Sequence, residues 1–214
     1  VVSWVDCIRQ ECPEAHICAH YSLKYNKAPR RGDDAHAARL ATFLNVCNNA
    51  NEVLIVSGSE GKGGTSPSWN TVKALEMLPA MESSLKVAIA YNPYFPDEQQ
   101  QAIEDDRLQQ KLATGRVSKI YLQFGTDTER LERALQHIKA TATMASNNGP
   151  QVTIAGSLFL PTAKLIAQQK FRPWNGVFLS DDFLSGPEQA SSIVQNMMEI
   201  YNQHNVEMLW EAPG

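Results

Sequence analysis

Short apolar runs alternate along the chain with stretches in which apolar residues recur every three or four positions. The runs at 16–21, 52–57, 86–91, 152–158 and 206–210 have the length and composition of strands in an α/β sheet, and another begins at Lys119. Between the runs the spacing is helical, as in Leu131, Leu135 and Ile138. The pattern therefore predicts strands separated by amphipathic helices.

Residues with capping chemistry mark where these helices begin. Asp34 and Asp97 each precede a helical stretch and are predicted N-caps. Ser185-Gly-Pro-Glu188 is a predicted capping box with proline in the first turn, and it opens a helix that runs to about residue 204. Residues 176–179 have the composition of one further short strand, and the pattern leaves that assignment open.

The spacing of the strands predicts a parallel sheet. Five strand starts fall near residues 16, 52, 86, 119 and 152, which are 36, 34, 33 and 33 apart. One strand and one helix per step is typical of parallel α/β architecture. We expect one domain, 1–214, with the fold of a (β/α)8 TIM barrel that lacks its first strand-helix-strand portion, because a complete barrel takes about 250 residues. A doubly wound open sheet is the alternative.

Composition narrows the functional classes. The chain has 214 residues, 43% of them apolar, and a net charge of −4 with scattered basic residues. This balance argues against a nucleic-acid partner, and no apolar run approaches the roughly 20 residues of a membrane span. The four cysteines lack CxxC spacing and have the pattern of reduced, packed thiols, which predicts a cytoplasmic protein. The first residue is Val1, so we expect that residues precede it in the intact protein.

Gln123 is the polar residue that stands out in the strand pattern. It follows Ile120 and Leu122 near the end of an apolar run and is expected to be buried, where an amide needs hydrogen-bond partners. In a barrel of alternating strands and helices, a polar group at the carboxyl end of a strand is placed to meet a ligand. The structural alternative is an amide bonded to neighbouring backbone.

The stretches around Gln123 resemble the methylenetetrahydrofolate reductase family. That family carries Tyr-Pro-Glu-x-His-Pro, Leu-x-x-Lys-x-x-Ala-Gly and Thr-Gln-x-x-x-Asp in the same order and at similar intervals. The matching stretches here are Tyr91-Asn-Pro-Tyr-Phe-Pro96, Asp106 to Gly115 and Leu122-Gln-Phe-Gly-Thr-Asp127. His20-Tyr-Ser-Leu and Val56-Ser-Gly-Ser59 are similar to the family's third-strand and fourth-strand motifs. The resemblance covers nearly the whole chain.

The resemblance implies a barrel that binds FAD across its strand ends and reduces a folate one-carbon unit with NAD(P)H. It implies that Gln123 contacts the pterin part of the folate, together with Asp127. It also implies a set of FAD contacts, namely His20, Ser57, Gly58, Ser59, Tyr91 and Lys111. A lysine suits the FAD pyrophosphate as a point charge. Lys111 as a solvated helix lysine and Tyr91 as a core tyrosine are the structural alternatives.

The chain departs from the family pattern at the flavin. Ser59 stands where the family has an aspartate, Ser57 replaces an arginine, and Phe95 replaces a histidine. Glu60 is the one carboxylate that could substitute as a catalytic group, and the family's general acid lies on a strand that this chain does not show.

These departures leave two functions open. The first is a flavin-dependent oxidoreductase acting on folate, and the second is a flavin-free relative that binds folate or a partner subunit without hydride transfer. The oligomeric state stays open, with a homo-oligomer among the alternatives. His16, Cys18 and His20 alternate along one strand, but this is not a standard zinc spacing, so no metal is expected.

Overall fold

Strands and helices alternate along the chain as the pattern predicts. The computed structural model describes residues 3–26, 32–57, 69–78, 85–145 and 151–211. The strands are β1 (Cys18–Ser22), β2 (Glu52–Val56), β3 (Lys86–Tyr91), β4 (Lys119–Leu122), β5 (Thr153–Phe159) and β6 (Glu207–Glu211). The helices are α1 (Trp4–Glu11), α2 (Asp33–Val46), α3 (Thr71–Glu76), α4 (Glu98–Ala113), α5 (Thr128–Ala145), α6 (Ala163–Phe171), α7 (Asp181–Ser185) and α8 (Pro187–His204). The predicted α/β class is confirmed.

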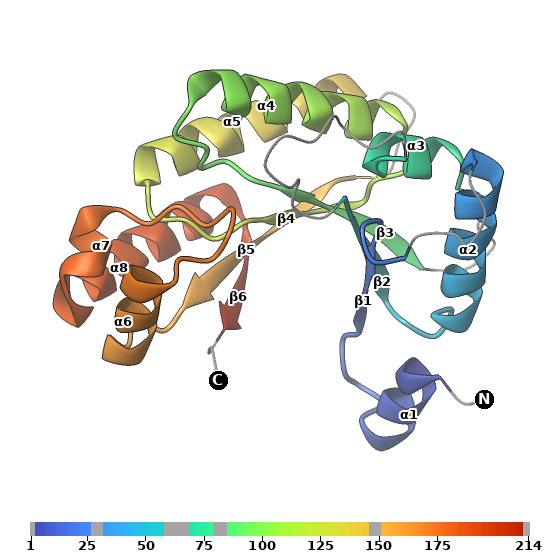
Figure 1. Cartoon of the computed structure of the whole chain (residues 1–214), viewed down its shortest axis with the longest axis horizontal. Helices are drawn as coiled ribbons and strands as arrows, with labels where there is room; N and C mark the ends of the chain where they lie inside the picture. The colour runs from blue at the N-terminus through green and yellow to red at the C-terminus, as the bar shows by residue number, and fades with distance from the viewer. Residues whose placement is uncertain (1–2, 27–31, 58–68, 79–84, 146–150, 212–214) are drawn as a thin grey trace.

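The sheet is an open half-barrel. All five strand pairings are parallel, and the spatial order β1 to β6 follows the chain order. In the described part of the chain β1 and β6 form the two edges, and the sheet curls without closing (Figure 1). The predicted fold, a (β/α)8 TIM barrel that lacks its first strand-helix-strand portion, is therefore wrong. A doubly wound sheet reverses its strand order at a switch point, and this sheet has no such reversal.

The crossover helices lie on the convex side of the curled sheet, and α1 lies apart, beyond the start of β1 (Figure 1). The strand side chains that face the helices form the main core. Ile55, Ile89 and Ile120 occupy one level across β2, β3 and β4, and none has exposed surface. Burying one such side chain stabilises the fold by about 1.5–3 kcal/mol. Alternation along each strand then directs the intervening side chains to the concave face.

One of the three predicted helix starts is confirmed. The predicted N-cap Asp34 is wrong, because α2 begins at Asp33 after Gly32, with no side-chain cap, and Asp34 lies in its first turn. Asp97 caps α4, because its side chain accepts a hydrogen bond from the backbone N–H of Gln99 at 2.8 Å. The predicted capping box at Ser185 is wrong. Ser185 is the last residue of α7 and its hydroxyl donates to the carbonyl oxygen of Asp182, while α8 begins at Pro187 after Gly186 with no side-chain cap. The prediction failed because Ser185 belongs to the short helix α7, which precedes α8.

A segment from the α6–α7 connection lies beside the end of β4. Within 176–179 the structure shows one isolated parallel bridge, between Gly125 and Phe178. The backbone N–H of Thr126 donates to the carbonyl oxygen of Phe178 at 3.3 Å, and the Asn92 amide donates to Gly176 at 2.9 Å. These bonds tie the connection to the carboxyl edge of the sheet. No helix in the described residues has both the length and the apolar character needed to cross a membrane.

Candidate functional site at the carboxyl end of the concave face

Gln123 projects from the carboxyl end of β4 on the concave side. Leu122 before it is buried in register with Tyr91, which packs against α4, so alternation turns Gln123 to the opposite face. The sequence predicted a buried amide, but this side chain is exposed. The prediction is wrong because the open half-barrel leaves this end of the concave face uncovered.

The oxygen of the Gln123 amide is hydrogen-bonded to the backbone, whereas its nitrogen has no partner among the described residues. Its Oε1 accepts a hydrogen bond from the N–H of Phe124 at 2.9 Å. Its Nε2 donates to none of the residues that the structure describes. The Gln123 backbone N–H extends the sheet by donating to the carbonyl oxygen of Tyr91 at 2.9 Å. The amide thus has a defined orientation with two donor hydrogens available to a ligand.

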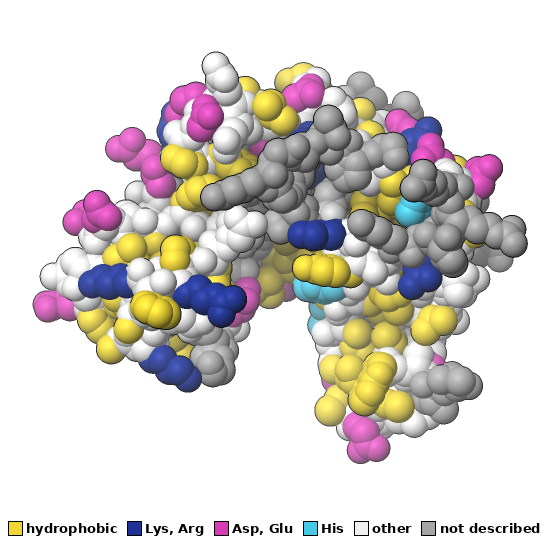
Figure 2. Space-filling view, in the orientation of Figure 1, with side chains coloured by type: hydrophobic (Ala, Val, Ile, Leu, Met, Phe, Trp, Pro, Cys, Tyr) yellow, Lys and Arg dark blue, Asp and Glu magenta, His cyan; other side chains and the backbone are white. Residues whose placement is uncertain are grey.

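Small side chains flank this part of β4. Tyr121 lies two residues before Gln123 on the same face, and it is in register with Ala90 of β3 and Ala155 of β5. Ser157 is the next residue of β5 on this face, and it is also small. The residues directly beside Tyr121 on both adjacent strands are therefore small. Figure 2 shows the concave face as a hollow between two arms, with histidine side chains on one wall.

A charged cluster occupies the amino end of the same face. Glu52 of β2 is 1% exposed, and its carboxylate accepts a hydrogen bond from the Tyr121 hydroxyl. His16 Nε2 lies 3.3 Å and Lys119 Nζ 3.6 Å from Glu52 Oε1. Lys119 Nζ also lies 2.8 Å from Glu207 Oε2 of β6, so the cluster links three alternate strands.

The cluster changes the ionisation of its members. Burial acts to raise the pKa of Glu52, but the bonds from Tyr121 and His16 and the charge of Lys119 outweigh it and lower that pKa. Burial and the bond to Glu52 raise the pKa of Tyr121, so its phenol stays protonated. Burial raises the pKa of Cys18 to about 11, which makes it a poor nucleophile.

Sequence reasoning missed this cluster. Its one signal was that Glu52, Lys119 and Glu207 each place a charge at the first residue of a strand, next to apolar neighbours. Which charges meet depends on the curl of the sheet, and the sequence pattern does not specify that curl.

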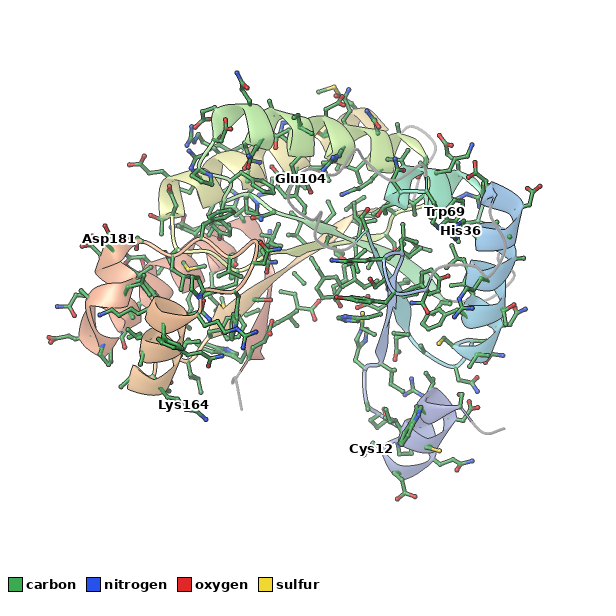
Figure 3. All side chains as sticks on the ribbon, viewed as in Figure 1. Cys12, His36, Trp69, Glu104, Lys164 and Asp181 are labelled. Carbon is green, nitrogen blue, oxygen red and sulfur yellow. The ribbon has the colours of Figure 1, made fainter. Side chains whose placement is uncertain are left out.

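The residues that the family resemblance assigned to FAD are largely engaged with the protein itself. The Tyr91 hydroxyl donates to Asp105 at 2.6 Å on the convex side. Lys111 is 7% exposed, and its ammonium donates to the carbonyl oxygen of Ala90 at 3.1 Å. It also lies 3.6 Å from Glu104, which is labelled in Figure 3. Burial lowers the pKa of Lys111, while Glu104 opposes that shift.

The remaining predicted site residues are dispersed. The Ser57 hydroxyl lies 2.7 Å from that of Thr71, and His20 is exposed on β1, three strands from Gln123. Asp127 caps the start of α5 by accepting from the N–H of Arg130 at 3.0 Å. Gly58, Ser59 and Glu60 lie outside the described residues.

The residues placed by the structure do not form an FAD cradle. Tyr91, Lys111 and Ser57 each direct their polar atoms to a protein partner, and Tyr91 faces away from the hollow. FAD binding stays a prediction. Among the described residues no group of three His, Cys, Asp or Glu side chains is arranged to hold a metal ion, the row of His16, Cys18 and His20 included.

Comparison with known proteins finds similar solved structures. No family model matches this chain, and no curated protein matches it. A solved structure of an uncharacterized protein from Clostridium thermocellum, which binds two copies of 5-methyl-5,6,7,8-tetrahydrofolic acid, is similar over 98% of this chain and 92% of its own. The sequence identity is 10% and the TM-score 0.48. At those values, the ligand of the present chain has to be argued from its own residues.

Proposed function

We propose that this chain binds a reduced folate at the carboxyl end of its concave face and does so without flavin-dependent hydride transfer. The observation that carries the proposal is the exposed, oriented amide of Gln123, whose Nε2 has no partner among the described residues. Gln123 stands in the Leu122–Asp127 stretch, whose resemblance to the folate-binding motif supports the same ligand.

The chemistry of a pterin matches this amide. A pterin presents a carbonyl oxygen and a ring N–H side by side, and a primary amide can donate to the first and accept from the second. Gln123 Oε1 retains a lone pair after accepting from Phe124. Because that bond already restricts the Gln123 side chain, this side chain loses less rotamer entropy when a ligand binds than a free glutamine would.

The surface beside Gln123 suits a flat ring. Tyr121 offers an aromatic face next to the small side chains of Ala90 and Ala155. Its hydroxyl is anchored by Glu52. A planar heterocycle can lie against such a fixed ring in an offset arrangement. Gln123 would then read the polar edge of the ligand, and Tyr121 would support its face.

The residues assigned to FAD bond to other parts of the protein, and this favours the flavin-free function over the oxidoreductase. A lysine that meets a pyrophosphate has to present its ammonium to solvent or ligand, whereas Lys111 is turned inward to Ala90 and Glu104. Releasing it would cost the hydrogen bond and expose a side chain that is 7% exposed now.

Calorimetric titration with 5-methyltetrahydrofolate and, separately, with FAD tests the proposal. We expect the parent chain to bind the folate, and Gln123→Leu to weaken binding by about 1–3 kcal/mol, because the polar edge of the ligand loses two hydrogen bonds. Gln203→Leu, on the exposed face of α8, is the matched control and should bind as the parent does. Folate affinity unchanged in Gln123→Leu, or tight FAD binding without folate binding, would overturn the proposal.

A further inference from the structure

A second polar depression lies at the opposite, amino end of the first three strands. It has a volume of about 460 Å³ and is lined by Ala50 and by polar residues, namely Arg9, His16, Asn48, Asn49, Asn51 and Lys86. These residues come from α1, the α1–β1 connection, the α2–β2 connection and the first residue of β3. Figure 1 shows α1 beyond the start of β1, on this side of the sheet.

The lining is cationic. Arg9 and Lys86 carry permanent positive charges, and no acidic side chain among the described residues lines the depression. Two acids outside the lining contact lining residues. Asp6 accepts a bond from Asn49 at 2.7 Å, and Glu52 lies 3.3 Å from His16 Nε2 and also contacts Tyr121 and Lys119. The lining residues themselves thus carry two positive charges and no negative one, which favours an anion.

Arg9 holds the depression in shape. Its guanidinium donates to the carbonyl oxygens of Pro13 and Ala15 at 2.6 and 2.8 Å and to Asn51 Oδ1 at 2.8 Å. Asn51 Oδ1 also accepts from the N–H of Ile17 at 2.8 Å. Arg9 thus joins α1, the α1–β1 connection and the α2–β2 connection, so the walls are fixed before any ligand arrives, while the charge of Arg9 remains.

Other side chains in the lining have hydrogen-bond donors that no described residue uses. The ammonium of Lys86 is exposed and has no hydrogen bond or ion pair with any residue in the described part of the chain. The Asn48 amide is likewise without a bond to a described residue. His16 uses Nε2 toward Glu52, which leaves Nδ1. Convergent donors of this kind, with no acid among them, are what a tetrahedral oxyanion requires.

We propose that this depression binds the phosphate group of a small molecule, with Lys86, Asn48 and His16 as its direct contacts and Arg9 as its electrostatic support. The site is independent of Gln123, because it opens at the other end of the strands. Phosphate carries more negative charge than a single carboxylate, so Arg9 and Lys86 attract it more strongly.

Titration of the full chain with inorganic phosphate, at constant ionic strength kept with sodium chloride, tests the site. Amide shifts in a proton–nitrogen correlation spectrum should saturate, and the largest should fall on Ala50, Asn51 and Lys86. Lys86→Ala should raise the phosphate concentration at half-saturation about tenfold, as expected for the loss of a charged hydrogen bond. Lys170→Ala, an exposed lysine on α6, controls for general charge and should leave it unchanged.

Two results would overturn the proposal. One is a set of shifts that grows linearly without saturation, and the other is half-saturation that is equal in the parent and in Lys86→Ala. Lys86→Gln keeps a polar side chain at this strand position and serves if the alanine variant does not fold. It should show the same loss of affinity, because the positive charge is what it removes.

Discussion

The Tyr94 ring lies directly against the backbone of Gly125. A Cβ atom added at Gly125 would collide with the ring atoms Cγ, Cδ1 and Cδ2 of Tyr94. Tyr94 itself is buried in the β3–α4 connection, at 2% exposed. The glycine in the Gln-Phe-Gly-Thr-Asp stretch is therefore required by packing, two residues from the amide that we assign to the ligand.

Gly125→Ala should consequently lower the free energy of unfolding. Overpacking of a buried contact costs about 1–3 kcal/mol, because the ring or the backbone has to move. Urea unfolding of Gly125→Ala, Tyr94→Leu and the double variant measures this cost as a cycle. The penalty of the alanine should shrink when Tyr94 is already shortened. An equal penalty in both backgrounds would mean that the ring is not what the methyl group meets.

Glu52 should make stability depend on pH in the acid range. Its pKa is lowered in the fold from the ordinary value of 4.5, since Tyr121, His16 and Lys119 together outweigh burial. The stabilisation is thus complete above pH 4.5 and is lost as the pH falls through the folded pKa. Urea unfolding at pH 7 and pH 3 should show a smaller acid loss in Glu52→Gln than in the parent. Glu211→Gln, an exposed carboxylate on β6, should behave as the parent does.

Tyr91→Phe should separate a structural role from a ligand role. The phenol donates to Asp105 at 2.6 Å and accepts from Gln101 at 3.1 Å, so its removal should cost about 1 kcal/mol of unfolding free energy. Folate affinity should not change, because Tyr91 faces α4 and not the hollow. A loss of affinity in the calorimetric titration with no loss of stability would contradict this assignment.

Thr126→Val should loosen the α6–α7 connection. The Thr126 hydroxyl accepts from the N–H of Ser180 at 2.7 Å, and valine keeps the shape of the side chain but not this bond. Hydrogen exchange should show a faster amide at Ser180, with little change in the β2 and β3 amides. Thr153→Val, at an exposed position, is the control. Equal protection of Ser180 in parent and variant would argue that other contacts hold the segment.

The sequence by itself determined the elements and their order. Apolar runs one strand-helix unit apart located the strands, because the alternation of side chains along a strand and the 3.6-residue turn of a helix are local properties. Asp97 could be named as a cap for the same reason, since the bond it accepts comes from two residues further on. The Ser185 cap could not be predicted in this way, because Ser185 is the last residue of α7 and does not precede a helix directly.

The tertiary structure decided how these elements meet. Whether six parallel strands close depends on their curl and on what lies at β1 and β6, and neither follows from a local pattern. The same openness exposes Gln123, which its apolar neighbours had marked as buried. Glu52 and Tyr121 are 69 residues apart and meet across β3, which has the small residues Ala88 and Ala90 on this face. Such contacts are set by the curvature of the sheet, which is a property of all the strands together.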